Sequence, residues 1–390
     1  MVKTFQFAQT PKIIFGNGKL AELPWLANNY GNDVLLVTGA GSFVHSIHGE
    51  FLFRTFEMTG IHYHQLAVMR EPSPELIDQT VIRFRDVNIR LVIAIGGGSA
   101  IDAGKAISAM LGRKESVKEF LEGVGAKDHP GTKVPFIAIP TTSGTGSEAT
   151  KNAVISEVGP LGFKRSLRHD NFVPDIAIVD PELTLYCPPD ITANSGMDCF
   201  TQLLESYLSN KATPITDALA FDAIGKLKNS LPRAWRMGQD IEARSGMSYA
   251  SLISGICLAN AGLGAVHGFA SSIGGLFVVP HGVVCGTLMA SANAVTVKRL
   301  KEHNSSHPAL LKYAELGKLF SGEEQKSQFY YIDRFVEILA EWTEMMNISR
   351  LGKYGIKHSD IDKVVAVTNI KNNPIKLSKE DLVEILEGRL

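Results

Sequence analysis

The sequence contains few cysteines, and none of them have the spacing of a disulfide framework. Four occur among the 390 residues, at Cys187, Cys199, Cys257 and Cys285. No two of them form a Cys-x-x-Cys pair, and small secreted proteins held by disulfides are much denser in cysteine. We therefore expect reduced thiols and a cytoplasmic protein.

A surplus of charge of one sign is also missing. The 39 Lys and Arg residues and the 40 Asp and Glu residues give a formal net charge of -1 at pH 7. Binding to nucleic acid or to an anionic membrane surface is typical of basic proteins. We therefore expect no nucleic-acid partner.

Long hydrophobic runs are absent as well. No stretch approaches the roughly 18 apolar residues that a transmembrane helix needs. The N-terminal residues lack an apolar segment followed by a small-residue cleavage site. We therefore expect neither a signal peptide nor a membrane partner. Hydrophobic residues still make up 45% of the chain, which is enough for a large core in two or three domains.

The first half of the chain alternates short apolar runs with helical patterns. Strand-like runs occur at Val34–Val37, Leu91–Ile95, Phe136–Ile139 and Ile176–Val179, and an amphipathic helix is predicted over Leu76–Asp86. The runs show no polar alternation, which is typical of strands buried on both faces of a parallel sheet. Helices between such strands predict an α/β fold built from βαβ units.

The second half has long helical periodicities and few strand-like runs. Predicted helices cover Asp198–Ser209, Ile215–Ser230, Ala243–Ala261 and Tyr330–Met346, and a capped final helix follows Ser378. We place a domain boundary near residues 186–191. The prediction is an α/β domain at residues 1–187 and a helical domain at residues 188–390.

A glycine-rich segment, Gly96-Gly97-Gly98-Ser99, joins the Leu91 strand to a helix. Glycines allow backbone N–H groups to approach a pyrophosphate closely, and the N-terminus of the following helix favours anions. The segment matches neither the Gly-x-Gly-x-x-Gly fingerprint nor a Walker loop. Taken alone, it fits a phosphate loop and a simple tight turn equally well.

A second polar loop follows the Phe136 strand. Residues 140–148 carry five hydroxyl side chains and two glycines. Ligands of parallel α/β sheets bind beyond the carboxyl ends of the strands. One such loop could be merely solvated, but two in the same context favour a nucleotide site.

Three residues are candidates for a metal site. His267 and His281 have small, apolar neighbours in the sequence, and Asp198 is expected to begin an apolar helix. Imidazole and carboxylate groups suit Zn²⁺ or Fe²⁺. Spacing alone does not link the three residues, and two buried histidines and a helix-capping carboxylate are an alternative interpretation.

Taken in order, these segments resemble the iron-containing (group III) alcohol dehydrogenase family of the dehydroquinate-synthase-like superfamily. The resemblance covers nearly the whole chain. The segments that carry it are PKIIFG at 11–16, GGGSAIDAGKAI at 96–107, PTTSGTGSEAT at 140–150, PDIAIVDP at 174–181, SGMD at 195–198, NAGLGAVHG at 260–268 and PHG at 280–282.

The resemblance implies a Rossmann-like N-terminal domain for the dinucleotide and an all-helical C-terminal domain for metal and substrate. It implies a metal-dependent alcohol dehydrogenase or aldehyde reductase. Such an enzyme transfers a hydride between NAD(P)(H) and a small or sugar-derived alcohol, with iron or zinc as Lewis acid. It also implies a homodimer.

The same resemblance assigns residues to the cofactor and the metal. It places Gly97, Gly98 and Ser99 on the pyrophosphate. Further residues are expected along the cofactor: Asp102, Thr141, Thr142, Thr145 and Lys164. Asp198, His267 and His281 match three of the four metal ligands of the family and are expected to be catalytic.

At three positions the sequence departs from the family pattern. Gln202 occupies the position of the remaining ligand histidine, four residues after Asp198; we expect it to bind the metal, more weakly than an imidazole. Ser271 stands where many members have a proton-relaying histidine, and a serine can join a relay but cannot act as a base. Gly39 replaces an aspartate that would repel a 2′-phosphate, so the choice between NAD and NADP stays open.

Other functions remain alternatives. A lyase related to dehydroquinate synthase would need several phosphate-binding Lys and Arg residues, and few lie near the histidine motifs. A sugar-acid alcohol oxidase of the 3-deoxy-octulosonate 8-oxidase type would release electrons differently. A nucleotide-binding relative without metal is the third alternative.

Overall fold

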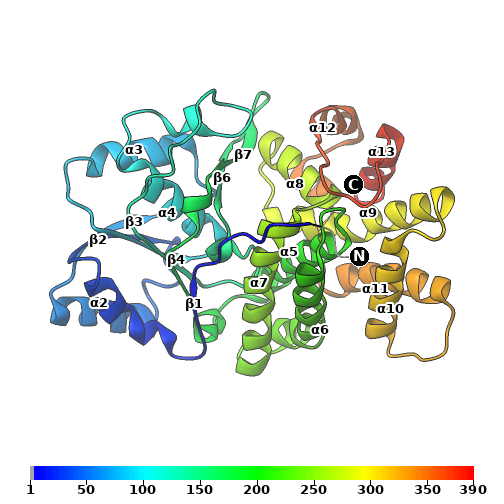
Figure 1. Ribbon diagram of the computed structural model, residues 1–390, viewed down its shortest axis with the longest axis horizontal. Coiled ribbons are helices and arrows are strands. Elements are labelled where there is room, and N and C mark those ends of the chain that lie inside the picture. Colours follow the sequence, from blue (N-terminus) through cyan, green and yellow to red (C-terminus); the bar gives the residue numbers. More distant parts are fainter. Residues whose placement is uncertain (1–3) are drawn as a thin grey trace.

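The computed structural model describes residues 4–390 (Figure 1). Within these residues, the N-terminal half forms a six-stranded sheet in the order β1-β8-β5-β4-β2-β3, and every neighbouring pair is parallel. The strands are β1 (Lys12–Phe15), β2 (Asp33–Thr38), β3 (His62–Ala67), β4 (Leu91–Gly96), β5 (Phe136–Pro140) and β8 (Ile176–Val179). The parallel α/β sheet predicted from the sequence is therefore confirmed.

Helices cover both faces of the sheet because its central strands are apolar on both sides. Val92 and Ala94 of β4 pack with α3 (Pro74–Phe84) and α4 (Gly98–Met110). Ile93 and Ile95 of the same strand face the opposite cluster, which includes residues of α1 (Leu23–Asn28) and α2 (Ile47–Thr59). A strand buried on both faces needs no polar alternation, which is why β2, β4, β5 and β8 were evident in the sequence.

Strands β1 and β3 and an antiparallel hairpin were not predicted from the apolar pattern. The hairpin pairs β6 (Asn152–Glu157) with β7 (Phe163–Arg168), and β6 contacts α4 whereas β7 contacts α8 (Ala265–Leu276). Figure 1 shows the hairpin between the sheet and the helical half. The hairpin contributes Ala153, Ile155 and Leu167 to the core, and polar residues between them interrupt the apolar pattern.

The helical half begins with α5 (Pro189–Leu208) and continues through eight further α-helices within the described residues. These are α6 (Pro214–Arg236), α7 (Ile241–Ala261), α8, α9 (His281–His303), α10 (Pro308–Ser321), α11 (Gln328–Met345), α12 (Ile361–Val367) and α13 (Lys379–Glu387). Short 3₁₀ turns connect elements at η1 (Lys19–Glu22), η2 (Val117–Phe120), η3 (Ser147–Ala149), η4 (Asp170–Phe172), η5 (Pro181–Thr184), η6 (Leu351–Tyr354) and η7 (His358–Asp360).

One predicted helix start was wrong, and it concerns the site. Asp198 does not begin a helix but lies in the middle of α5, which starts at Pro189. Proline suits the first helical position, and Asp190 adds a favourable charge in the first turn. The Asp198 carboxylate therefore serves no capping role. The predicted final helix is confirmed as α13, which is capped by Ser378.

The expected division between residues 187 and 188 falls between η5 and α5 and stays a prediction. Among the described residues, no single helix is long and apolar enough to cross a membrane. Within residues 4–390, α7 and α8 taken together, bent by 96°, reach the necessary length and composition.

The two halves meet at a close seam where backbone packs on backbone. Gly146, in the loop after β5, has φ +61°, and a Cβ added to Gly255 of α7 would lie 2.1 Å from the Gly146 carbonyl oxygen. A Cβ on Gly144 would lie 2.9 Å from Cβ of Ser195 on α5. The loop after β5 is therefore pressed against two helices of the C-terminal half.

Replacing Gly255 with alanine should loosen this seam. We expect Gly255→Ala to lower the free energy of unfolding by about 1–3 kcal/mol because the new methyl group overlaps backbone atoms. Urea denaturation measures the change. Gly225→Ala on α6 is the matched control: its Cβ meets nothing within 4 Å, so it should leave stability unchanged or raise it by about 1 kcal/mol. Equal effects of the two substitutions would contradict the close contact.

Candidate active site

The glycine-rich segment lies at the carboxyl end of β4 and leads directly into α4. Gly97 is the N-cap residue of α4 and offers no side-chain cap, so the first backbone N–H groups of α4 are free of a capping side chain. A Cβ on Gly98 would lie 2.8 Å from the Thr145 hydroxyl oxygen, and one on Gly97 would lie 3.4 Å from that of Thr142. The glycine-rich and threonine-rich loops thus lie side by side.

A third loop joins them at the end of β2. A Cβ on Gly96 would lie 3.1 Å from the backbone nitrogen of Gly39, whereas a Cβ on Gly39 would meet nothing within 4 Å. Strands β2, β4 and β5 are neighbours, so their loops share one edge of the sheet. Three loops at this edge, one of them leading into a helix N-terminus, form the usual setting for a dinucleotide in parallel α/β folds.

Of the residues predicted to bind the cofactor, most lie on these three loops or in the first turn of α4. They are Gly39, Gly97, Gly98, Ser99, Thr141, Thr142 and Thr145. Their contacts with a cofactor stay a prediction.

Asp102 is placed differently from these loop residues. Its buried carboxylate accepts hydrogen bonds from the Ser147 hydroxyl (2.9 Å) and the Val154 backbone N–H (3.1 Å). Burial raises the pKa of Asp102, although the nearby charge of Lys105 acts to lower it. Asp102 therefore ties α4 to the threonine-rich loop and to β6, and its predicted contact with the cofactor must compete with these bonds.

Lys105, one turn after Asp102, lies beneath the same loop. Its ammonium group donates to the Ser147 carbonyl (2.7 Å), the Thr150 hydroxyl (3.0 Å) and the Asn152 carbonyl (2.9 Å). Burial lowers its pKa to about 8. Lys105 and Asp102 together fix the backbone of the loop that faces the glycine-rich segment.

Lys164 lies on β7 at the boundary between the two halves. Its ammonium group forms an ion pair with Glu71, and its side chain packs against Gly274 of α8. Its positive charge is close enough to contribute to lowering the pKa of His281. Lys164 therefore links the sheet half to the histidine cluster, although its predicted contact with the cofactor is not tested.

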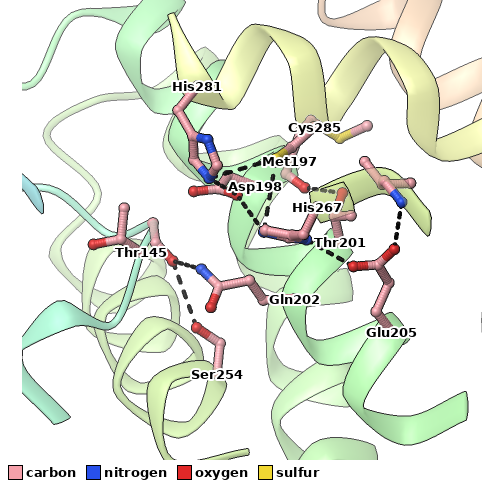
Figure 2. A network of polar contacts seen from close by, with 12 residues as sticks. Thr145, Met197, Asp198, Thr201, Gln202, Glu205, Ser254, His267, His281 and Cys285 are labelled. Atoms are coloured by element: carbon pink, nitrogen blue, oxygen red, sulfur yellow. Dashed lines mark hydrogen bonds and ion pairs between the residues drawn. The ribbon is translucent and has the colours of Figure 1, made fainter. Parts of the chain in front are cut away.

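Four side chains from three helices form a compact polar cluster (Figure 2). Asp198 comes from α5, His267 from α8, and His281 and Cys285 from α9; their ligand atoms all lie within 4.8 Å of one another. Asp198 Oδ1 lies 3.3 Å from His267 Nε2 and 3.6 Å from His281 Nε2. The fold thus brings together the three predicted metal ligands, which are far apart in the sequence.

Glu205 orients one of these ligands and was not predicted. Its Oε2 lies 2.7 Å from His267 Nδ1, and its Oε1 accepts the Val266 backbone N–H at 2.7 Å. Because Nδ1 faces a carboxylate, Nε2 is directed into the cluster. Carboxylates commonly hold metal-binding histidines in this way.

Charges in the cluster depend strongly on one another. Burial alone would raise the pKa of Asp198, but His281 and His267 outweigh it and lower that pKa to about 2. Burial would lower the pKa of His267, but Cys285, Asp198 and Glu205 raise it well above its usual value. Burial and then Lys164 lower the pKa of His281 to about 4. The cluster therefore holds an ionised carboxylate beside one imidazole that favours a proton and one that resists it.

Two polar atoms of the cluster are buried without a hydrogen-bond partner among residues 4–390. They are Asp198 Oδ1 and His281 Nδ1. A buried carboxylate oxygen without a donor is costly unless a cation lies next to it. A carboxylate, two imidazoles and a thiol are a donor set that suits a divalent transition metal. The residues present therefore fit a metal ion.

Gln202 and Ser271, which were predicted to join the site, make other contacts. The Gln202 amide nitrogen donates to the Gly144 carbonyl at 3.4 Å, and Figure 2 shows the amide turned toward the Thr145 loop. Its oxygen has no partner among the described residues. The Ser271 hydroxyl donates to the His267 carbonyl one turn earlier, at 3.1 Å. Both predicted roles remain untested.

Two family patterns match this sequence, one in each half of the chain. The pattern of the iron-containing alcohol dehydrogenases matches residues 10–181, and that of the C-terminal part of the Fe-containing alcohol dehydrogenase family matches residues 192–390. The chain therefore belongs to the iron-containing alcohol dehydrogenase family. Members of this family are oxidoreductases that act on CH–OH groups with a nicotinamide cofactor and a divalent metal.

Particular relatives agree over nearly their full length. The chain is 30% identical to an NAD-dependent methanol dehydrogenase of Bacillus methanolicus, covering 97% of this chain and 98% of the relative. It is 30% identical to an NADPH-dependent butanol dehydrogenase of Clostridium saccharobutylicum, covering 98% and 97%. A solved structure of a 1,3-propanediol oxidoreductase superposes with a TM-score of 0.88 at 26% identity and covers 100% of both chains.

Removing the charge of Glu205 should weaken metal binding without removing a ligand. Glu205→Gln can still accept the Val266 N–H, but an amide no longer favours the His267 tautomer that directs Nε2 into the cluster. We expect the metal dissociation constant to rise about 10–100-fold, as measured by competition with a chromogenic chelator.

Glu315→Gln is the control for this test. Glu315 accepts from the Tyr207 hydroxyl at 2.6 Å, outside the cluster, so this substitution should leave metal affinity unchanged. Unaltered affinity in Glu205→Gln would show that Glu205 does not orient His267.

Proposed function

We propose that this protein interconverts small or sugar-derived alcohols and their aldehydes at the seam between the cofactor loops and the Asp198–His267–His281 cluster. One observation supports this location of the active site. The threonine-rich loop that faces Gly97 and Gly98 also touches α5, through Gly144 against Ser195 and through the Gln202 bond to Gly144. Ser195 and Gln202 lie on either side of Asp198 on that helix. The edge proposed for the dinucleotide and the Asp198–His267–His281 cluster are therefore connected through α5.

Each group of residues has one task in this proposal. Asp198, His267 and His281 hold a divalent metal, iron or zinc, which when bound supplies Lewis acidity to the oxygen of the substrate. Glu205 fixes the ring of His267. The loops at the carboxyl ends of β2, β4 and β5 would hold NAD(P)(H), which when bound would supply the hydride donor for aldehyde reduction or the hydride acceptor for alcohol oxidation. In the oxidation direction the alcohol proton would be released to solvent.

The size of the substrate is inferred from relatives. Those compared above are named for methanol, butanol and 1,3-propanediol, which are all small alcohols. Short alcohols or aldehydes are therefore the first substrates to test. The cofactor choice follows less directly, since one relative is named as NAD-dependent and another as NADPH-dependent.

Assembly and compartment are part of the same proposal. We infer a cytoplasmic homodimer. The compartment rests on the four cysteines, all of which are free thiols in the structure.

The test of the proposed function is hydride transfer by metal-loaded protein. Apoprotein reconstituted with Zn²⁺ or Fe²⁺ should consume NADH or NADPH when given short aldehydes, and the loss of nicotinamide absorbance measures the rate. His267→Ala should abolish turnover. Failure with every metal and every aldehyde would overturn the proposal, and peroxide production from alcohol without nicotinamide would favour an oxidase instead.

Gly39 provides a separate test of cofactor choice. Gly39→Asp should place a carboxylate near the 2′-position of the ribose, where NADPH carries a phosphate. Two like charges about 4 Å apart repel by about 1 kcal/mol at the dielectric constant of water and by about 4 kcal/mol at that of a protein surface. We expect kcat/KM with NADPH to fall at least about tenfold relative to NADH, since 1.4 kcal/mol corresponds to a factor of ten.

Gly39→Ala is the control because a Cβ at this position meets nothing within 4 Å. It should change neither cofactor's kcat/KM. An unchanged NADPH to NADH ratio in Gly39→Asp would place the ribose elsewhere.

A further inference from the structure

Cys285 is a fourth potential ligand in the cluster. It lies on α9 one turn after His281 and is completely buried. Its sulfur lies 3.7 Å from His267 Nε2 and 3.7 Å from His281 Nε2. Figure 2 shows the sulfur beside both imidazoles and Asp198. The sulfur and the Asp198 oxygen thus approach the same pair of nitrogens.

Four of the separations between these atoms match those of a tetrahedral metal site. With bonds of about 2.0–2.1 Å to nitrogen and oxygen and about 2.3 Å to sulfur, a tetrahedron separates nitrogen from sulfur by about 3.6 Å and nitrogen from oxygen by about 3.3 Å. The observed nitrogen–sulfur separations are both 3.7 Å, and the nitrogen–oxygen separations are 3.3 and 3.6 Å. Four edges of the tetrahedron are therefore matched within about 0.3 Å.

Hydrogen bonding alone does not account for the cluster. A thiol has one weak donor and cannot donate to two imidazole nitrogens at once. Asp198 Oδ1, on a side chain only 2% exposed, still lacks a hydrogen-bond partner among residues 4–390. One cation between the four atoms would contact Asp198 Oδ1, the Nε2 atoms of both imidazoles and the sulfur together.

We propose that the thiolate of Cys285, rather than the Gln202 amide, is the fourth protein ligand of the metal, and that it makes the site selective for zinc. This inference rests on the proposed function, because it concerns the same metal. On binding, the thiol releases its proton to solvent and the sulfur donates an electron pair to the ion. Thiolate ligands favour zinc over the harder divalent ions, which prefer oxygen.

Gln202 is the less suitable ligand in this geometry. Its amide nitrogen already donates to the Gly144 carbonyl, which belongs to the threonine-rich loop. This bond joins α5 to the loop, whereas the amide oxygen has no hydrogen-bond partner among residues 4–390. Gln202 is better placed to hold that loop, while Cys285 needs no change of partner.

The direct test is X-ray absorption at the zinc edge on the reduced, zinc-loaded protein. We expect one sulfur neighbour at about 2.3 Å, with the remaining neighbours nitrogen or oxygen at about 2.0–2.2 Å. Cys285→Ser should lose the sulfur neighbour and bind zinc at least about 100-fold more weakly, more than the loss of an outer-shell partner. Gln202→Ala should keep the sulfur neighbour.

Cys257→Ser is the matched control. Cys257 is also completely buried, but its sulfur contacts the Thr216 carbonyl, away from the cluster. It should retain both the sulfur neighbour and the zinc affinity of the unaltered protein.

A zinc ion with only nitrogen and oxygen neighbours in the unaltered protein, or a sulfur neighbour that survives in Cys285→Ser, would overturn the inference. If hydride transfer persists in either case, the proposed function still stands. Absence of bound metal together with absence of hydride transfer would overturn both.

Discussion

The structure of the site depends on the buried carboxylate of Asp198, which needs an opposite charge beside it. Its carboxylate is almost completely enclosed within the helical half. Removing an ionised carboxylate from water is very costly unless an opposite charge lies next to it. His267 lies between Asp198 and Glu205, and these neighbours together with Cys285 raise its pKa. A metal ion beside Asp198 would supply the opposite charge and bind His267 Nε2, while Glu205 keeps its contact with Nδ1.

Helix α5 connects this charge to the cofactor edge. Asp198 and Glu205 lie seven residues apart on one face of the helix, which places both beside His267. Gln202 lies between them and reaches the Gly144 carbonyl. The helix that holds the metal ligand therefore also contacts the loop that faces Gly97 and Gly98. Backbone contact between Gly146 and Gly255 leaves no room for a side chain at this seam.

How much could be predicted from the sequence depended on whether the signal was local. Strands β2, β4, β5 and β8 were evident because each is a continuous apolar run. Strand β3, at the edge of the sheet, and the hairpin β6–β7 were not predicted, because their polar residues hide the pattern. The predicted start of α5 at Asp198 was wrong, because the helix begins at Pro189, and a proline suits the first turn of a helix.

The residues of the site were harder to predict from the sequence than the fold was. Asp198, His267 and His281 could be linked only through the family resemblance, since no spacing rule joins residues so far apart. Glu205 and Cys285 were missed because each appears ordinary in the sequence and gains its role only where α5, α8 and α9 converge. Glu71 was also missed, because its partner Lys164 lies on β7, a strand that was not predicted.

Anomalous diffraction from crystals grown with metal and reduced cofactor tests the central claim most directly. The account predicts a single strong peak in contact with Asp198, His267 and His281, with the nicotinamide ring beside it and the pyrophosphate over Gly97 and Gly98. A peak at other residues, or a cofactor bound away from the carboxyl ends of β4 and β5, would contradict it.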